Sequence, residues 1–127
     1  MKTVTEFYKK MILPLKDRIT IYLPQGKGEK RIEKDLFGWK LYYGRNFIEC
    51  RSEEEARYLK IFLDIGKSRV DVPGDLNKLK EILPVLEKIK ERIDRIIESN
   101  LDGLLDRQMR ERIRWKVWKE VSSLEED

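Results

Sequence analysis

The sequence contains no histidine and only one cysteine, Cys50. A disulfide within the chain needs two cysteines, and protein zinc sites are built mainly from cysteine and histidine. Both kinds of site are therefore excluded, together with histidine-dependent acid–base catalysis and the Ser-His-Asp triad. Any bound metal would have oxygen ligands, as Mg²⁺, Mn²⁺ or Ca²⁺ has in proteins.

Long hydrophobic runs are also missing. No apolar stretch approaches the roughly 18 residues that a membrane-spanning helix needs, and the N-terminal MKTVTEFYKK lacks the apolar segment of a secretion signal. We therefore expect a cytoplasmic protein with no membrane partner. Charged residues make up 41% of the 127 residues and the net charge is +4. This composition favours a globular chain with an ion-paired, thermophile-like surface and permits anionic partners.

Local signals predict where helices and strands begin. Two capping boxes, Thr3–Glu6 and Ser52–Glu55, predict helices over 4–12 and 53–65. Alternating β-branched and aromatic residues are typical of strands. The strands predicted in this way cover 18–23, 39–43, 46–51 and 69–72. Residues 30–37 fit either an extension of the second strand or an irregular arm.

The C-terminal part of the chain has a helical pattern. Asp75 can cap a helix whose isoleucines and leucines recur at spacings of three and four, as in helices that pack along another helix. This predicted seam consists of Leu79, Ile82, Leu86, Ile89, Ile93 and Ile96. Pro84 predicts a kink or a restart of the helix. A turn over 100–103 then leads to a final helix over about 104–121.

Together these signals predict one α+β domain over residues 1–127, with the element order α-β-β-β-α-β. A core over 1–74 would hold a small mixed sheet of about four strands. Because a helix separates the third and fourth strands, a parallel crossover is expected. Residues 75–121 would form an antiparallel helical hairpin, followed by a frayed acidic tail over 122–127.

The final predicted helix carries a concentration of positive charge. Residues 107–119 contain six basic side chains and one acidic one, and phosphate binding could release counterions from such a cluster. The predicted phosphate contacts are Arg107, Arg110 and Arg114, joined by Lys27, Lys30 and Arg31 of the glycine-containing loop LPQGKGEKR. Trp115 or Trp118 would stack on bases of DNA or RNA. A solvated helix face or a protein-binding face explains the same pattern.

The stretch FIECRS, residues 47–52, contains candidate residues for a reaction centre. In a strand, Phe47, Glu49 and Arg51 share one face, where a carboxylate could hold Mg²⁺ and a cation could stabilise developing charge. Asp35 is the nearest upstream carboxylate that could serve as a second ligand.

The spacing of these residues, Asp35, thirteen residues and then Glu49-Cys50-Arg51, resembles the signature of the PD-(D/E)xK nuclease-like superfamily. The element order over residues 4–72 also resembles the core of that superfamily. The resemblance implies that Asp35 and Glu49 are catalytic metal ligands, that Glu6 is an additional acid, and that Arg51 replaces the motif's lysine. Arginine could stabilise charge there but could not act as a base.

The leading hypothesis from the sequence is nucleic-acid binding, on a nuclease-like scaffold with degraded or absent catalysis. The rival hypothesis is a protein-interaction module without enzymatic activity, which would form a homodimer through helices within 76–121.

Overall fold

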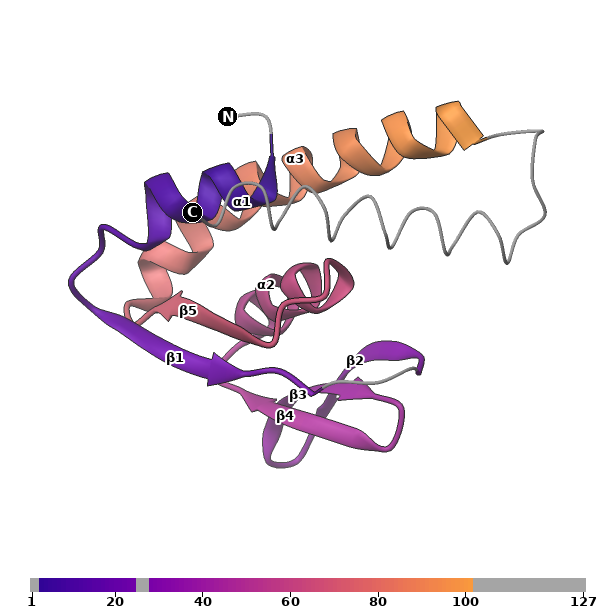
Figure 1. Ribbon diagram of the computed structural model, residues 1–127. Helices are drawn as coiled ribbons and strands as arrows, with labels where there is room; N and C mark the ends of the chain where they lie inside the picture. The colour runs from indigo at the N-terminus through magenta and orange to yellow at the C-terminus, as the bar shows by residue number, and fades with distance from the viewer. Residues whose placement is uncertain (1–2, 25–27, 102–127) are drawn as a thin grey trace.

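The computed structural model describes residues 3–24 and 28–101 of the chain (Figure 1). Its helical elements are α1 (Val4–Phe7), the π-helical segment η1 (Tyr8–Ile12), α2 (Glu53–Asp64) and α3 (Leu76–Leu101). Its strands are β1 (Arg18–Tyr22), β2 (Lys30–Asp35), β3 (Gly38–Tyr43), β4 (Asn46–Cys50) and β5 (Arg69–Pro73). The predicted α+β class is confirmed.

The three helices begin at the predicted caps. The Thr3 hydroxyl accepts a 3.1 Å hydrogen bond from the Glu6 amide, and the Ser52 hydroxyl accepts one of 3.1 Å from the Glu55 amide. The Asp75 carboxylate accepts a 2.8 Å bond from the Asn77 amide at the start of α3. Each cap satisfies an amide that has no partner within its own helix.

The strands form two antiparallel sheets, β1-β5 and β2-β3-β4, so the expected single mixed sheet with a parallel crossover is wrong. Two tyrosine hydroxyls occupy backbone groups of β5. The Asp71 amide donates to the Tyr8 hydroxyl at 2.9 Å, and the Tyr58 hydroxyl donates to the Asp71 carbonyl at 2.7 Å. Tyrosine side chains thus take the backbone groups that a parallel neighbour would need.

Residues 30–37 form neither an extension of the second predicted strand nor an irregular arm. They supply the separate strand β2, which pairs with β3 from Lys30 opposite Tyr43 to Asp35 opposite Gly38. The two-residue turn Leu36–Phe37 joins the strands, and Gly38 has a φ of 121°, a conformation that glycine adopts without steric cost.

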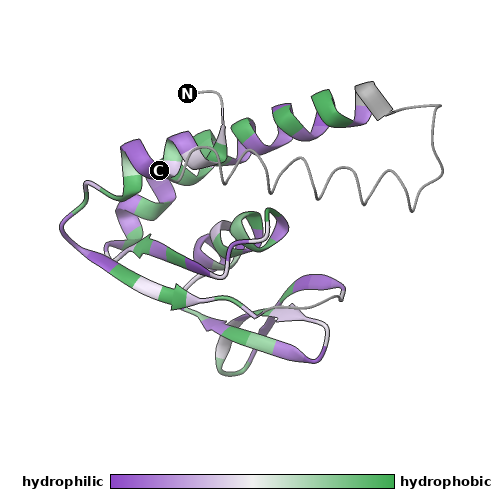
Figure 2. Ribbon diagram, viewed as in Figure 1, coloured by the Kyte–Doolittle hydropathy of each residue, from purple (hydrophilic) through white to green (hydrophobic). Residues whose placement is uncertain are grey.

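Helix α2 lies at the centre of the fold and contacts both sheets and α3 (Figure 1). Figure 2 shows hydrophobic and hydrophilic positions alternating around α2 and α3, as expected of amphipathic helices. Leu59 and Phe62 of α2 are fully buried with Leu41 of β3, Val72 of β5 and Leu86 of α3. One hydrophobic core therefore serves both sheets.

Helix α3 runs through Pro84 as one element, so the restart, one of the two predicted alternatives, is wrong. Pro84 is exposed, so water can bond the Lys80 carbonyl that proline leaves without an intrahelical partner. The predicted seam holds from Leu79 to Ile89, but Ile96 is 54% exposed and Ile97 is buried instead. A strict spacing of three and four drifts around a helix of 3.6 residues per turn, which moves the buried position by one residue.

The predicted final helix over 104–121, and with it the hairpin and the acidic tail over 122–127, lies outside the described residues. Within the described part of the chain, no helix combines the length and the apolar character that crossing a membrane requires.

Candidate functional site

The outer face of the β2-β3-β4 sheet carries both acids of the nuclease-like motif. Asp35 ends β2, and Glu49 of β4 pairs in register with Lys40 of β3. The Lys40 ammonium lies 2.8 Å from an Asp35 carboxylate oxygen. This hydrogen bond, helped by one from the Phe37 amide, lowers the pKa of Asp35. The lysine between the two acids therefore neutralises Asp35.

The spacing of these acids is wide for a shared metal ion. Because β3 separates their strands, the two backbones are about 10 Å apart, whereas Mg²⁺ binds oxygens at about 2.1 Å. No group of three acids or cysteines suited to a metal occurs among residues 3–24 and 28–101. The assignment of Asp35 and Glu49 as metal ligands stays a prediction, and the described contacts favour a lysine-centred ion cluster.

Arg51, the third residue of the motif, is engaged in structural contacts. Its guanidinium donates to the Glu55 carboxylate at 2.6 Å, to the Gly74 carbonyl at 2.7 Å and to the Pro73 carbonyl at 2.9 Å. The side chain of Glu55 is only 2% exposed. Arg51 thus neutralises a buried carboxylate and joins the β4–α2 corner to the end of β5.

The two predicted phosphate contacts that the structure describes are also paired with acids. The Lys30 ammonium lies 2.8 Å from Asp64, and the Arg31 guanidinium lies 2.9 Å from Glu33. Binding a phosphate at either residue would have to compete with these ion pairs. The other predicted contacts lie outside the described residues: Lys27, Arg107, Arg110, Arg114, Trp115 and Trp118.

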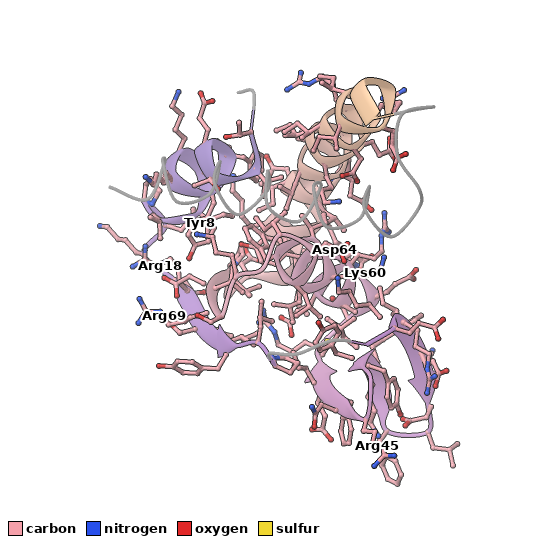
Figure 3. All side chains as sticks on the ribbon, turned by 45° about the vertical axis from the view of Figure 1, so that its right-hand side comes forward. Tyr8, Arg18, Arg45, Lys60, Asp64 and Arg69 are labelled. Carbon is pink, nitrogen blue, oxygen red and sulfur yellow. The ribbon has the colours of Figure 1, made fainter. Side chains whose placement is uncertain are left out.

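A different cluster of cations surrounds a hollow of about 640 Å³ beside β1, β5 and η1. We call this hollow the basic pocket. Among the described residues that line it, three are basic and one is acidic. Its lining consists of Thr5, Tyr8, Lys9, Leu13, Tyr22, Lys67, Ser68, Arg69 and Asp71. Figure 3 shows Tyr8, Arg18 and Arg69 on this side of the molecule.

The pairing of β1 with β5 builds one wall of the basic pocket. Tyr22 pairs in register with Arg69, so the two side chains stand next to each other on one face. The Asp71 carboxylate accepts a 2.7 Å hydrogen bond from Thr20 and lies 3.5 Å from the Arg18 guanidinium. The acid in the described lining is therefore already neutralised by β1.

Lys9 and Arg69 have no acidic partner among the described residues. Tyr8 adds a hydrogen-bond donor between them, because its oxygen accepts from the Asp71 amide and its hydrogen has no acceptor within the described chain. Burial raises the pKa of Tyr8, while the charges of Arg18 and Arg69 oppose that rise. Tyr8 is therefore neutral near pH 7, with cationic side chains close enough to affect its hydroxyl.

Two other hollows offer less to an anion. One of about 330 Å³ between α2 and α3 is lined by four acids and three bases, with ion pairs between Arg57 and Glu87 and between Lys90 and Asp94. Figure 3 shows Lys60 and Asp64, which line it, on the side of the molecule away from Tyr8. Among the described residues, the other hollow is lined by α3 alone.

The basic pocket was not among the sites predicted from the sequence. Its cations lie at 9, 67 and 69, in segments whose charge pattern is ordinary for this chain. The signal available in the sequence was Tyr22, which shares a strand face with Arg18 and Thr20 rather than with Ile19 and Ile21. Pairing of β1 with β5 was needed to place Arg69 beside it.

Comparison of the chain with protein-family models, curated proteins and solved structures finds no match.

Proposed function

We propose that the protein binds nucleic acid through the basic pocket. Lys9 and Arg69 contact phosphates, and Tyr22 stacks on a base. The observation that carries this proposal is that two cations without acidic partners among the described residues flank the same hollow. These cations can take a phosphate without giving up an ion pair, and their binding releases the counterions condensed on the nucleic acid.

Tyr22 favours a single-stranded ligand. It is 73% exposed although it belongs to a strand, and it stands next to Arg69. An aromatic ring can stack on a base only where that base is unstacked from its neighbours, as it is in single strands. Such stacking contributes about 1–3 kcal/mol per base and tolerates any sequence.

Binding of a labelled single-stranded oligonucleotide to the full chain, followed by fluorescence anisotropy, tests the proposal. The affinity should fall steeply between about 50 and 200 mM salt. Arg69→Gln and Lys9→Gln should each weaken binding and reduce the slope of log affinity against log salt by about one. Tyr22→Ala should weaken binding with little change in that slope.

Arg45→Gln is the matched control. Arg45 is exposed in the β3–β4 turn, and Figure 3 shows it at the far end of the three-stranded sheet. Its replacement removes the same charge without touching the basic pocket and should leave the affinity nearly unchanged. Equal losses from Arg45→Gln and Arg69→Gln would mean that the whole surface binds, and absence of binding at low salt would remove the proposal.

A protein-interaction module is the second candidate, favoured by apolar side chains at the tip of the β2–β3 hairpin. Leu36 is 98% exposed and Phe37 is 89% exposed, although such turns usually carry polar residues or glycine. Exposed apolar groups of this kind are typical of contact surfaces. Light scattering over a range of concentrations would show a dimer that Phe37→Ser disrupts, whereas a monomer at every concentration would exclude self-association.

A further inference from the structure

The basic pocket brings together donors from two separate parts of the chain, residues 8–9 and residues 67–69. The helical segment η1 supplies Tyr8 and Lys9, the α2–β5 connection supplies Lys67 and Ser68, and β5 supplies Arg69. Arginine can donate two parallel hydrogen bonds to a phosphate, and hydroxyl and ammonium groups can bond the remaining oxygens. Donors from two parts of the chain around one hollow suit a group with several free oxygens at the end of a molecule.

The charge of the lining also favours a terminal group with several free oxygens. Lys9 and Arg69 contribute positive charge that no acid among the described residues neutralises, while Asp71 is already bound by Arg18 and Thr20. A phosphodiester within a strand carries one negative charge and two free oxygens. A phosphate monoester carries about −1.5 to −2 near pH 7 and three acceptor oxygens. The monoester therefore matches this cluster better than an internal phosphate does.

We propose that the basic pocket takes the terminal phosphate monoester of a nucleic-acid strand. The Arg69 guanidinium and Lys9 ammonium bind its oxygens, Tyr8 donates its hydroxyl hydrogen, and the terminal base lies on Tyr22. This inference rests on the proposed function, because it names which part of a nucleic acid the same site takes.

The size of the hollow is consistent with this ligand. Its volume of about 640 Å³ exceeds what one phosphate fills and falls within the range of about 300–1,000 Å³ typical of small-molecule sites. Space therefore remains for the sugar and base attached to the phosphate, on the side where Tyr22 and Arg69 pair in register.

The pH dependence distinguishes a terminal phosphate from an internal one. The charged and titratable groups among the described residues that face or border the pocket are Tyr8, Lys9, Arg18, Tyr22, Lys67, Arg69 and Asp71. The chain has no histidine, the side chain that ordinarily titrates between pH 5 and 8. A monoester, by contrast, loses its second charge below about pH 6. Affinity for a terminal phosphate should therefore fall on acidification, and affinity for internal phosphates should not.

The test compares one short single-stranded oligonucleotide in three forms, with a 5′-phosphate, with a 3′-phosphate or with hydroxyls at both ends. Each is titrated against the full chain by anisotropy at constant ionic strength, at about pH 7.5 and at about pH 5. One phosphorylated form should bind about tenfold more tightly than the hydroxyl form, the gain expected of one further charged hydrogen bond. The preference should shrink at the lower pH and disappear in Arg69→Gln, and it should persist in Arg45→Gln.

The outcomes separate the inference from the proposed function. Equal binding of all three forms, still weakened by Arg69→Gln, would overturn the terminal-phosphate inference and leave nucleic-acid binding standing. No binding of any form would overturn both. Inorganic phosphate serves as a competitor: if it displaces the strand as effectively as the phosphorylated oligonucleotide does, the pocket takes a free anion and the inference is wrong.

Discussion

At the scale of single residues, the fate of each cation depends on the nearest acid. Lys30 and Arg31, which the sequence singled out for phosphate, form ion pairs with Asp64 and Glu33. Lys9 and Arg69, which no motif marked, have no acidic partner in the described chain and share a hollow. The residue type fixes the charge of a side chain. Whether that charge is available to a ligand depends on the acids that lie near it in the fold.

The contrast between Arg51 and Glu49 gives the first prediction. Arg51→Ala should lower the free energy of unfolding by about 3 kcal/mol, because it leaves the buried Glu55 carboxylate without its guanidinium. Glu49→Gln, on the exposed sheet face, should change it by about 0.5 kcal/mol or less. Urea denaturation near pH 7 measures both. If Arg51→Ala changed the free energy of unfolding as little as Glu49→Gln, the contacts of Arg51 would contribute little to stability. Its assignment to a reaction centre would then be open again.

Cys50 gives a prediction about pH. Burial, helped by the charge of Glu55, raises the pKa of the thiol from 9.0 to about 12. The folded state therefore holds the proton longer than the unfolded state does, so this contribution to stability is complete below about pH 9 and is lost as the pH rises toward 12. The free energy of unfolding should fall over this range, and it should fall less in Cys50→Ala. Alkylation of the native thiol at pH 8 should be slow and should become fast in urea.

At the scale of elements, a close contact between two backbone segments explains a glycine for which the sequence suggested a binding role. Gly28 belongs to a glycine-containing loop that could have cradled phosphate through its amides. A Cβ placed on Gly28 would lie 2.8 Å from the backbone of Gly44 in the β3–β4 turn. Glycine is needed there because two backbone segments meet, which is a packing reason for this residue.

Helix α3 gives a prediction at this scale. Pro84→Ala restores the hydrogen bond to the Lys80 carbonyl and removes the clash of the proline ring with the preceding turn. Because Pro84 is exposed, no packing is lost. The free energy of unfolding should rise by about 1–3 kcal/mol, measured by urea denaturation. A decrease would indicate that the proline bends α3 into the shape that fits against α2.

At the scale of the whole molecule, two small sheets depend on one helix. Neither a two-stranded nor a three-stranded sheet of this size buries much surface alone, and α2 contacts both. Phe62 of α2 packs against Tyr8, with ring centroids 5.3 Å apart, and against Tyr58 at 4.8 Å. The ring that supports the core therefore also positions the hydroxyl of the basic pocket.

Phe62→Ala should consequently destabilise the whole fold. The expected loss is about 3–5 kcal/mol, the usual cost of removing a buried phenylalanine ring. Amide hydrogen exchange should show β1–β5 and β2–β3–β4 losing protection together, since they share a core. Phe47→Ala, at a side chain that is 51% exposed, is the matched control and should cost much less. Loss of protection confined to β1–β5 would mean that the two sheets unfold independently.

The sequence by itself determined the local features of this protein. Caps at Thr3, Ser52 and Asp75 involve residues two or three positions apart, so the helix starts could be predicted from neighbours alone. The alternation that places Ile48 and Cys50 toward the core and Glu49 toward solvent is equally local. Caps and strand alternation depend on residues a few positions apart, so they can be predicted without knowledge of the rest of the chain.

The tertiary structure alone decided which strands pair and which charges meet. Tyr8 bonds the amide of Asp71, 63 positions away, and thereby closes the edge where a parallel neighbour was expected. The tertiary structure also places Lys9 and Arg69 around one hollow and Arg51 against Pro73 and Gly74. Hydrogen bonds and ion pairs act over a few ångströms in space, and many partners of similar chemistry compete for them. Which of these hydrogen bonds and ion pairs form therefore depends on how α2 packs both sheets into one core.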